Sequence, residues 1–223
     1  MMEEHAVDPH LELQLSDSTD EQRTHWEAVY RAKASTETSW YQPVLQRSLE
    51  LIQAAAVPPG AAILDVGGGA STLVDDLLAA GFTDVTVLDI ASTALAQARA
   101  RLGAKAACVQ WIVADITTWQ PTRRYVVWHD RAVFHFLVDP ALRARYLSSL
   151  RAALAPGGHV VIATFGPEGP TRCSGLDVQR YSTETLSAVL GSAFRLMRSQ
   201  LEEHVTPAGK RQQFLYCWWR SEL

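Results

Sequence analysis

The stretch Ile63-Leu-Asp-Val-Gly-Gly-Gly-Ala-Ser71 joins an apolar run to three consecutive glycines. The run from Ala61 to Val66 predicts a buried strand, and a helical pattern begins at Ser71. Glycine is needed where the backbone turns sharply and where a ligand approaches without a Cβ in the way. A strand, a glycine turn and a helix in this order predict a nucleotide-type site at the carboxyl end of a parallel strand.

The charge of this loop distinguishes between nucleotide ligands. A dinucleotide site uses G-x-G-x-x-G, which places a pyrophosphate on a helix N-terminus. Here Thr72 stands where the third glycine would be. Asp65, two residues before the first glycine, would repel a pyrophosphate. A carboxylate there suits a ligand with a cationic amino group, such as S-adenosylmethionine, which has no phosphate. A dinucleotide-binding domain is the alternative, because Asp89 would fit it equally well.

Five landmarks in order along residues 58–219 resemble the class I S-adenosylmethionine-dependent methyltransferases. They are the loop Asp65–Gly69, the acidic end of Val85–Asp89, the segment Trp111–Ile116, the strand Tyr125–Asp130 and the element Leu154-Ala-Pro-Gly-Gly158. The resemblance implies that S-adenosyl-L-methionine is the cofactor and S-adenosyl-L-homocysteine the product. It also implies that Asp89 accepts the ribose hydroxyls and that Asp115 faces the adenine amine. The predicted cofactor-binding residues are Asp65, Gly67, Gly68, Gly69, Asp89, Ile90, Asp115, Ile116 and Tyr41.

Apolar runs alternate with helical patterns through most of the chain, which indicates a parallel, doubly wound sheet. Two longer runs near the C-terminus flank the turn Thr206-Pro-Ala-Gly209 and predict an antiparallel hairpin. We therefore expect an α/β, Rossmann-like, seven-stranded sheet that is mostly parallel. Strands are predicted near 61–66, 85–89, 108–113, 125–129, 158–165, 194–204 and 212–220, and helices near 71–80, 92–102, 141–154 and 183–191.

The N-terminal region contains no strand pattern. Residues 1–19 are polar and charged, which is typical of a flexible tail. Residues 20–57 carry two helical patterns, 20–33 and 43–55, and are predicted to form a lid over the cofactor end of the sheet. Residues 58–223 are predicted to form the cofactor-binding core.

The segment after the fourth core strand is expected to face the methyl group. His129, Asp130 and Arg131 are the predicted catalytic residues there. Asp130 could act as a base, bind the cofactor's amino group or cap a helix, and Arg131 could hold an anionic substrate or pair with Asp130. The predicted substrate-binding residues are Trp40, His135, Arg172 and Tyr181, with a core position as the alternative for His135.

The pair Asp130-Arg131 is similar to a step in thiopurine and related thiol methyltransferases, and also to one in protein lysine methyltransferases. The glycine that often follows the basic residue in both groups is replaced by Ala132. No substrate is therefore transferred from either resemblance.

Composition limits the classes of partner. The 223 residues carry a formal net charge of −4, which argues against nucleic acid as a partner. Three widely spaced cysteines indicate neither disulfides nor a metal site, and no apolar run is long enough to span a membrane. We expect a cytoplasmic methyltransferase acting on a small molecule. A protein lysine N-methyltransferase is the alternative, and a non-catalytic cofactor-binding module is the third hypothesis. The oligomeric state is not predicted.

Overall fold

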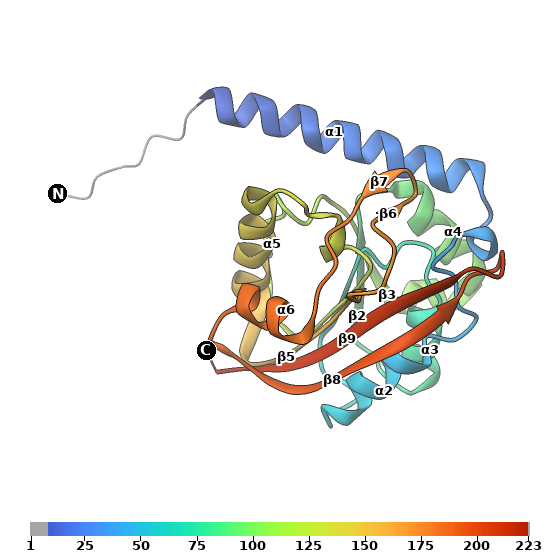
Figure 1. Cartoon of the computed structure of the whole chain (residues 1–223). Coiled ribbons are helices and arrows are strands. Elements are labelled where there is room, and N and C mark those ends of the chain that lie inside the picture. Colours follow the sequence, from blue (N-terminus) through green and yellow to red (C-terminus); the bar gives the residue numbers. More distant parts are fainter. Residues whose placement is uncertain (1–8, 223) are drawn as a thin grey trace.

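A seven-stranded sheet forms the centre of the molecule (Figure 1). The computed structural model describes residues 9–222, with side chains from Asp20 onward. The strand order is β3-β2-β1-β4-β5-β9-β8; β1 to β5 run parallel, and β9 is antiparallel to both β5 and β8. The predicted Rossmann-like sheet with its antiparallel hairpin is thus confirmed. The strands are β1 Ile63–Val66, β2 Val85–Asp89, β3 Val109–Val113, β4 Tyr125–Arg131, β5 Leu154–Phe165, β8 Phe194–Val205 and β9 Arg211–Ser221.

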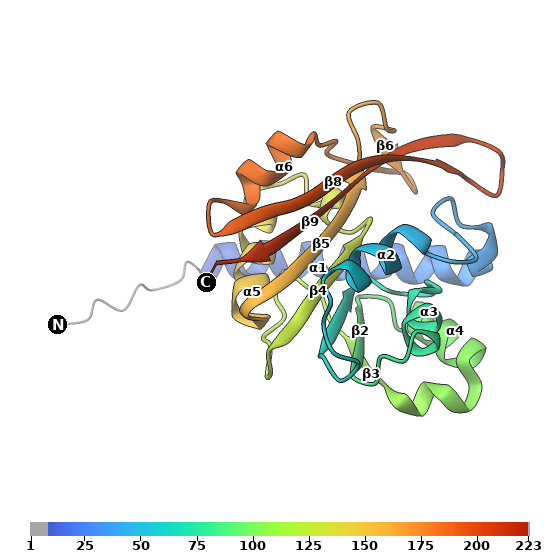
Figure 2. The ribbon, with the colours of Figure 1, turned by 90° about the horizontal axis from the view of Figure 1, so that it is seen from below.

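Helices cover both faces of the sheet (Figure 2). Leu51, Leu73 and Leu95 of three helices pack in one apolar core, and Tyr146 and Leu186 of two others pack in the core on the opposite face. The first group is α2 Gln46–Ala54, α3 Leu73–Ala79 and α4 Ser92–Leu102, and the second is α5 Pro140–Ala153 and α6 Thr183–Leu190. The short elements are η1 Ser35–Glu37, η2 Gly103–Cys108, η3 Phe134–Phe136, β6 Arg172–Cys173 and β7 Leu176–Asp177.

The N-terminal helix α1, Pro9–Ala32, crosses the end of the sheet (Figure 1). Residues 9–19, expected in a tail, are therefore helical, because proline is compatible with a first helical turn and no helix breaker follows it before Ala32. The rest of the predicted tail, residues 1–8, lies outside the described residues.

The second N-terminal helix, α2, belongs to the core and not to the segment above the sheet. Its Leu51 and Ile52 are buried against the same core as Val161 of β5 and Trp218 of β9. A lid can therefore comprise only α1 and the connection that follows it, up to about residue 42. Within residues 9–222, no helix is both long and apolar enough to cross a lipid bilayer.

The side chain of Glu27 links α1 to α4, as does Gln97 of α4, whose amide donates to the Tyr30 carbonyl at 2.7 Å. The residue before α4 is Ala91, which offers no side-chain cap. The carboxylate of Glu27, on α1, supplies the cap from a distance: it accepts from the backbone N–H and hydroxyl of Ser92, both at 2.7 Å, and from the hydroxyl of Thr93. These bonds outweigh the effect of burial and lower the pKa of Glu27 to about 2. The position of α1 is thus coupled to the helix that follows β2.

Candidate active site

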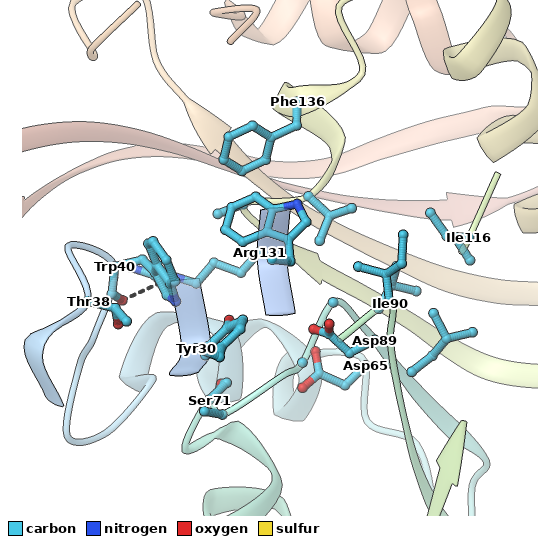
Figure 3. Close-up of a pocket in the computed structure, with 18 of the residues that line it drawn as sticks. Tyr30, Thr38, Trp40, Asp65, Ser71, Asp89, Ile90, Ile116, Arg131 and Phe136 are labelled. Atoms are coloured by element: carbon cyan, nitrogen blue, oxygen red, sulfur yellow. Dashed lines mark hydrogen bonds between the residues drawn. The ribbon is translucent and has the colours of Figure 1, made fainter. Parts of the chain in front are cut away.

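A pocket lies at the carboxyl ends of β1, β2 and β4, below α1 (Figure 3). It has a volume of about 1140 Å³ with its mouth included. The structure brings together here the predicted residues Trp40, Tyr41, Asp65, Gly67, Gly68, Asp89, Ile90, Asp115, Ile116, His129 and Arg131.

The glycine loop follows β1 and forms the floor of the pocket. Gly67 has a φ of +63°, and a Cβ there would lie 1.9 Å from a methyl group of Val133. A Cβ on Gly68 would lie 2.5 Å from a carboxylate oxygen of Asp65. The loop therefore requires glycine at both positions, and it brings bare backbone next to any ligand. Gly69 is not among the lining residues, but it lies against Asp89, since a Cβ there would be 2.9 Å from a carboxylate oxygen of that residue.

Asp89 ends β2 and faces the pocket with only 6% of its surface exposed. One carboxylate oxygen accepts from the backbone N–H of Ala91 at 2.8 Å. Burial, together with the charges of Asp65 and Glu27, raises its pKa to about 7. Hydrogen bonds from a ligand, such as those from the two hydroxyls of a ribose, would stabilise the charged form of this buried carboxylate.

Ile90 and Ile116 line the pocket on the side of Asp89 that is away from Trp40 (Figure 3). Asp115, also in the lining, accepts from the backbone N–H and the hydroxyl of Thr117, both at 2.8 Å. An apolar slot with a fixed carboxylate at its rim suits a flat base with an exocyclic amine.

His129 of β4 stands between two polar partners. Its Nδ1 lies 2.7 Å from the carboxylate of Asp65 and its Nε2 lies 2.8 Å from the hydroxyl of Ser48 on α2. Both ring nitrogens are engaged and the side chain is 1% exposed. This geometry fits a residue that orients Asp65, rather than a base that takes a proton from substrate.

Four aromatic side chains enclose the other end of the pocket. Trp26 contacts Phe136 with ring centroids 5.0 Å apart and Trp40 at 5.9 Å, and Trp40 contacts Tyr30 at 6.1 Å. Trp26 and Tyr30 lie within the helical pattern predicted for residues 20–33, but neither was among the predicted site residues. Their spacing of four residues puts both rings on the same side of α1, and this was the available signal.

The family model described as a methyltransferase domain matches residues 63–158. That range contains the glycine loop, Asp89, Asp115 and β4. Residues 63–158 of this chain therefore form a methyltransferase domain, and the whole fold resembles that of solved methyltransferases. Two structural neighbours, the N-methyltransferase NodS of Bradyrhizobium japonicum WM9 and the glycopeptide N-methyltransferase MtfA, hold S-adenosylhomocysteine, and the glycine loop and Asp89 of this chain fit such a ligand as described.

Known proteins resemble this chain in sequence and in structure. Nodulation protein S of Rhizobium tropici is 29% identical over 144 residues, which are 63% of this chain and 56% of that protein. The matched part is thus little more than half of that relative. A second similar protein comes from a structural study of the conversion of a disulfide bond into a thioacetal group during echinomycin biosynthesis. Its structure matches with a TM-score of 0.69 at 21% identity, and the match covers 88% of this chain and 91% of that chain.

A further structural neighbour carries both of its ligands. It is the Burkholderia thailandensis 1,6-didemethyltoxoflavin-N1-methyltransferase, with 1,6-didemethyltoxoflavin and S-adenosylhomocysteine bound. Its TM-score is 0.65 at 20% identity, with 99% of this chain and 93% of that one covered. The likeness shows that the two proteins share a fold.

The prediction of Asp130 as a catalytic residue of the methyltransferase is corrected. β4 continues to Arg131, so alternation along the strand turns Asp130 to the opposite face from His129 and Arg131. Asp130 is fully buried, does not line the pocket, and accepts from the Tyr146 hydroxyl at 2.7 Å and the Val133 N–H at 2.9 Å. Burial raises its pKa to about 6. The capping alternative matches these contacts, because Val133 precedes η3.

Tyr146→Phe tests this assignment in the methyltransferase. The Tyr146 hydroxyl accepts from the indole of Trp128 at 2.8 Å and donates to Asp130, so its loss leaves two buried partners unsatisfied. We expect a loss of about 2–4 kcal/mol in the free energy of unfolding. S-adenosylhomocysteine affinity, measured by calorimetry below the melting temperature, should stay unchanged. A large loss of affinity at full folding would contradict the structural role of Asp130.

Three predicted substrate-binding residues, His135, Arg172 and Tyr181, also lie outside the pocket. His135 is fully buried and accepts from the Phe165 N–H, and burial lowers its pKa to about 3 with a smaller effect from Arg131. Tyr181 is buried against Phe134. Arg172 is exposed and pairs with Asp177.

From the segment 166–181, Cys173 is the residue that lines the pocket. Burial raises the pKa of its thiol, so the thiolate form is disfavoured. Among the described residues, no three His, Cys, Asp or Glu side chains are grouped so as to hold a metal ion.

Proposed function

We propose that this methyltransferase transfers the methyl group of S-adenosylmethionine to a small-molecule acceptor. The observation that carries the proposal is the aromatic end of the pocket, which α1 and the connection after it cover with Trp26, Tyr30 and Trp40. A pocket covered in this way suits a compact acceptor that is enclosed during transfer. The toxoflavin N1-methyltransferase supports this, since its structure holds a small acceptor.

The cofactor would lie along the carboxyl ends of β1 and β2. Its methionine amino group would face Asp65, its ribose Asp89, and its adenine the slot between Ile90 and Ile116. Methyl transfer from a sulfonium is an in-line displacement, so the protein contributes proximity, orientation and a dry pocket. Aromatic faces also attract the positive sulfonium. A general base is needed only when the acceptor atom is protonated on binding.

The test is transfer of radiolabelled methyl from the cofactor into an extract separated by ultrafiltration. We expect label in the small-molecule filtrate, and none with a variant that has lost cofactor binding. Label that is retained as a discrete protein band would contradict the proposal and favour the lysine methyltransferase alternative.

A further inference from the structure

Arg131, at the end of β4, is a buried cation to which the described residues offer no carboxylate within 4 Å. Its Nε donates to the Tyr216 hydroxyl and its Nη1 to the Trp40 carbonyl, both at 2.8 Å. Its Nη2 is covered from solvent and has no partner among the described residues. A buried guanidinium with neutral partners and an unsatisfied nitrogen is costly unless an anion compensates for it.

The surroundings do not neutralise this charge. The alternative in which Arg131 pairs with Asp130 is wrong, because the two side chains lie on opposite faces of the sheet. The guanidinium lies 4.6 Å from the ring centroid of Phe214, a cation–π contact that offsets only part of the cost. Nearby acids are engaged by other groups: Asp65 by His129, and Glu202 by Arg47.

The position of this cation separates it from the expected cofactor site. Arg131 pairs with Ala163 of β5, and Ala163 pairs with Tyr216 of β9, so the guanidinium reaches across β5 to bind the tyrosine. Asp65 lies on β1, on the other side of β4. In Figure 3, Arg131 lies with Trp40 on one side of the pocket, and Ile90 and Ile116 lie on the far side of Asp65 and Asp89. Arg131 therefore lies at the aromatic end of the pocket, where the acceptor is expected to bind beside the cofactor.

We propose that Arg131 binds an anionic group of the acceptor, and that the acceptor is a small molecule with a carboxylate or similar anion on a flat apolar body. This inference rests on the proposed function. The guanidinium supplies the charge-assisted hydrogen bonds, and Trp26, Trp40 and Phe136 supply the apolar surface beside it.

Benzoate and its neutral isostere benzamide test the proposal on the full-length protein saturated with S-adenosylhomocysteine. We expect benzoate to bind about tenfold or more tightly than benzamide in calorimetry, because the bonds to the guanidinium are charge-assisted. Arg131→Gln should abolish this preference, and Arg131→Lys should keep part of it. Equal binding of the two probes to the wild type would overturn the proposal.

Two matched variants keep the result interpretable. Arg124→Gln makes the same change just before β4, where the side chain bonds to the Leu154 carbonyl, and it should leave the preference intact. Tyr216→Phe keeps the cation but removes one of its hydrogen-bond partners, so it should weaken the preference without abolishing it. Circular dichroism and thermal unfolding identify variants that fail to fold. If Arg131→Gln does fail, an unchanged preference in Tyr216→Phe would overturn the proposal.

The carboxylate of the cofactor is the competing source of the anion. S-adenosylhomocysteine and its decarboxylated analogue separate the two: the proposal expects Arg131→Gln to change the ratio of their affinities by less than about threefold. Loss of the wild type's preference for the intact cofactor in this variant would overturn the proposal in favour of a cofactor site. Label entering proteins in the transfer assay would overturn the proposed function. Label in uncharged small molecules alone would overturn only this inference.

Discussion

Asp89→Asn should lose most cofactor affinity and should also change how the stability of the empty protein depends on pH. The carboxylate that ends β2 is expected to accept both ribose hydroxyls, and the amide keeps one acceptor without the charge. Bonds to a charged group are worth about 1.5–3 kcal/mol each, so calorimetry should show S-adenosylhomocysteine bound roughly 100-fold more weakly. Affinity within about threefold of wild type would mean that Asp89 does not hold the ribose.

The stability effect follows from the raised pKa of about 7, against an ordinary value of 3.8. An acid with a raised pKa in the fold contributes stability that is present below its unfolded pKa and is lost as pH rises through the folded value. The wild-type apoprotein should therefore lose stability between about pH 4 and pH 7, and Asp89→Asn should not. Denaturant melts should show the difference, variant minus wild type, growing by about 3 kcal/mol over this range.

The same titration predicts that wild-type affinity for S-adenosylhomocysteine falls below pH 7, because the protonated acid cannot accept from both hydroxyls. The variant should lack this dependence. Asp84→Asn is the matched control, since it removes an acid that pairs with Arg123 just before the same strand. It should leave both the affinity and its dependence on pH unchanged.

The strands and helices of the core could be predicted because their signals are local. β2 and α4 occupy the predicted ranges 85–89 and 92–102, since apolar runs end in an acid and a cap-like polar residue. The hairpin of β8 and β9 was located by the turn around Pro207 and Gly209 between two strand-like runs. Each signal lies within a few residues of the element that it defines.

The errors fall where the outcome depends on packing or on one residue of register. β4 extends two residues beyond the predicted end at residue 129. Asp130 is therefore part of the strand, and its side chain points to the face opposite the pocket. Arg172 and Tyr181 were predicted to bind substrate, but Arg172 is exposed and Tyr181 packs into the core, while Cys173 of the same segment reaches the pocket. The cap of α4 comes from Glu27, 65 residues earlier, for which a single sequence holds no local signal.

Glu27→Ala should release α1 from the pocket and reduce methyl transfer. The carboxylate caps the N-terminus of α4 through Ser92 and Thr93, and no side chain at the cap position itself replaces it. Its loss removes a cap worth about 1 kcal/mol and the attraction of an anion to a helix N-terminus, worth up to about 1 kcal/mol. Hydrogen exchange should accelerate in residues 20–32, and kcat/KM should fall about tenfold or more.

Glu27→Ala should reduce the rate of methyl transfer more than the affinity for the cofactor. The reason is that α1 contributes Trp26 and Tyr30 to the pocket, whereas the glycine loop and Asp89 are at the ends of β1 and β2. The pKa of Glu27 is lowered to about 2 from an ordinary 4.5, so its stabilisation is fully present above pH 4.5 and is lost as pH falls toward 2. At neutral pH the Glu27 carboxylate of the wild type is therefore ionised and makes its hydrogen bonds to α4. Glu21→Gln, at an exposed position of the same helix, is the control and should behave as wild type. Unchanged exchange and activity in Glu27→Ala would show instead that the other contacts of α1, namely the rings of Trp26 and Tyr30 and the hydrogen bond from Gln97, are sufficient to hold it in place.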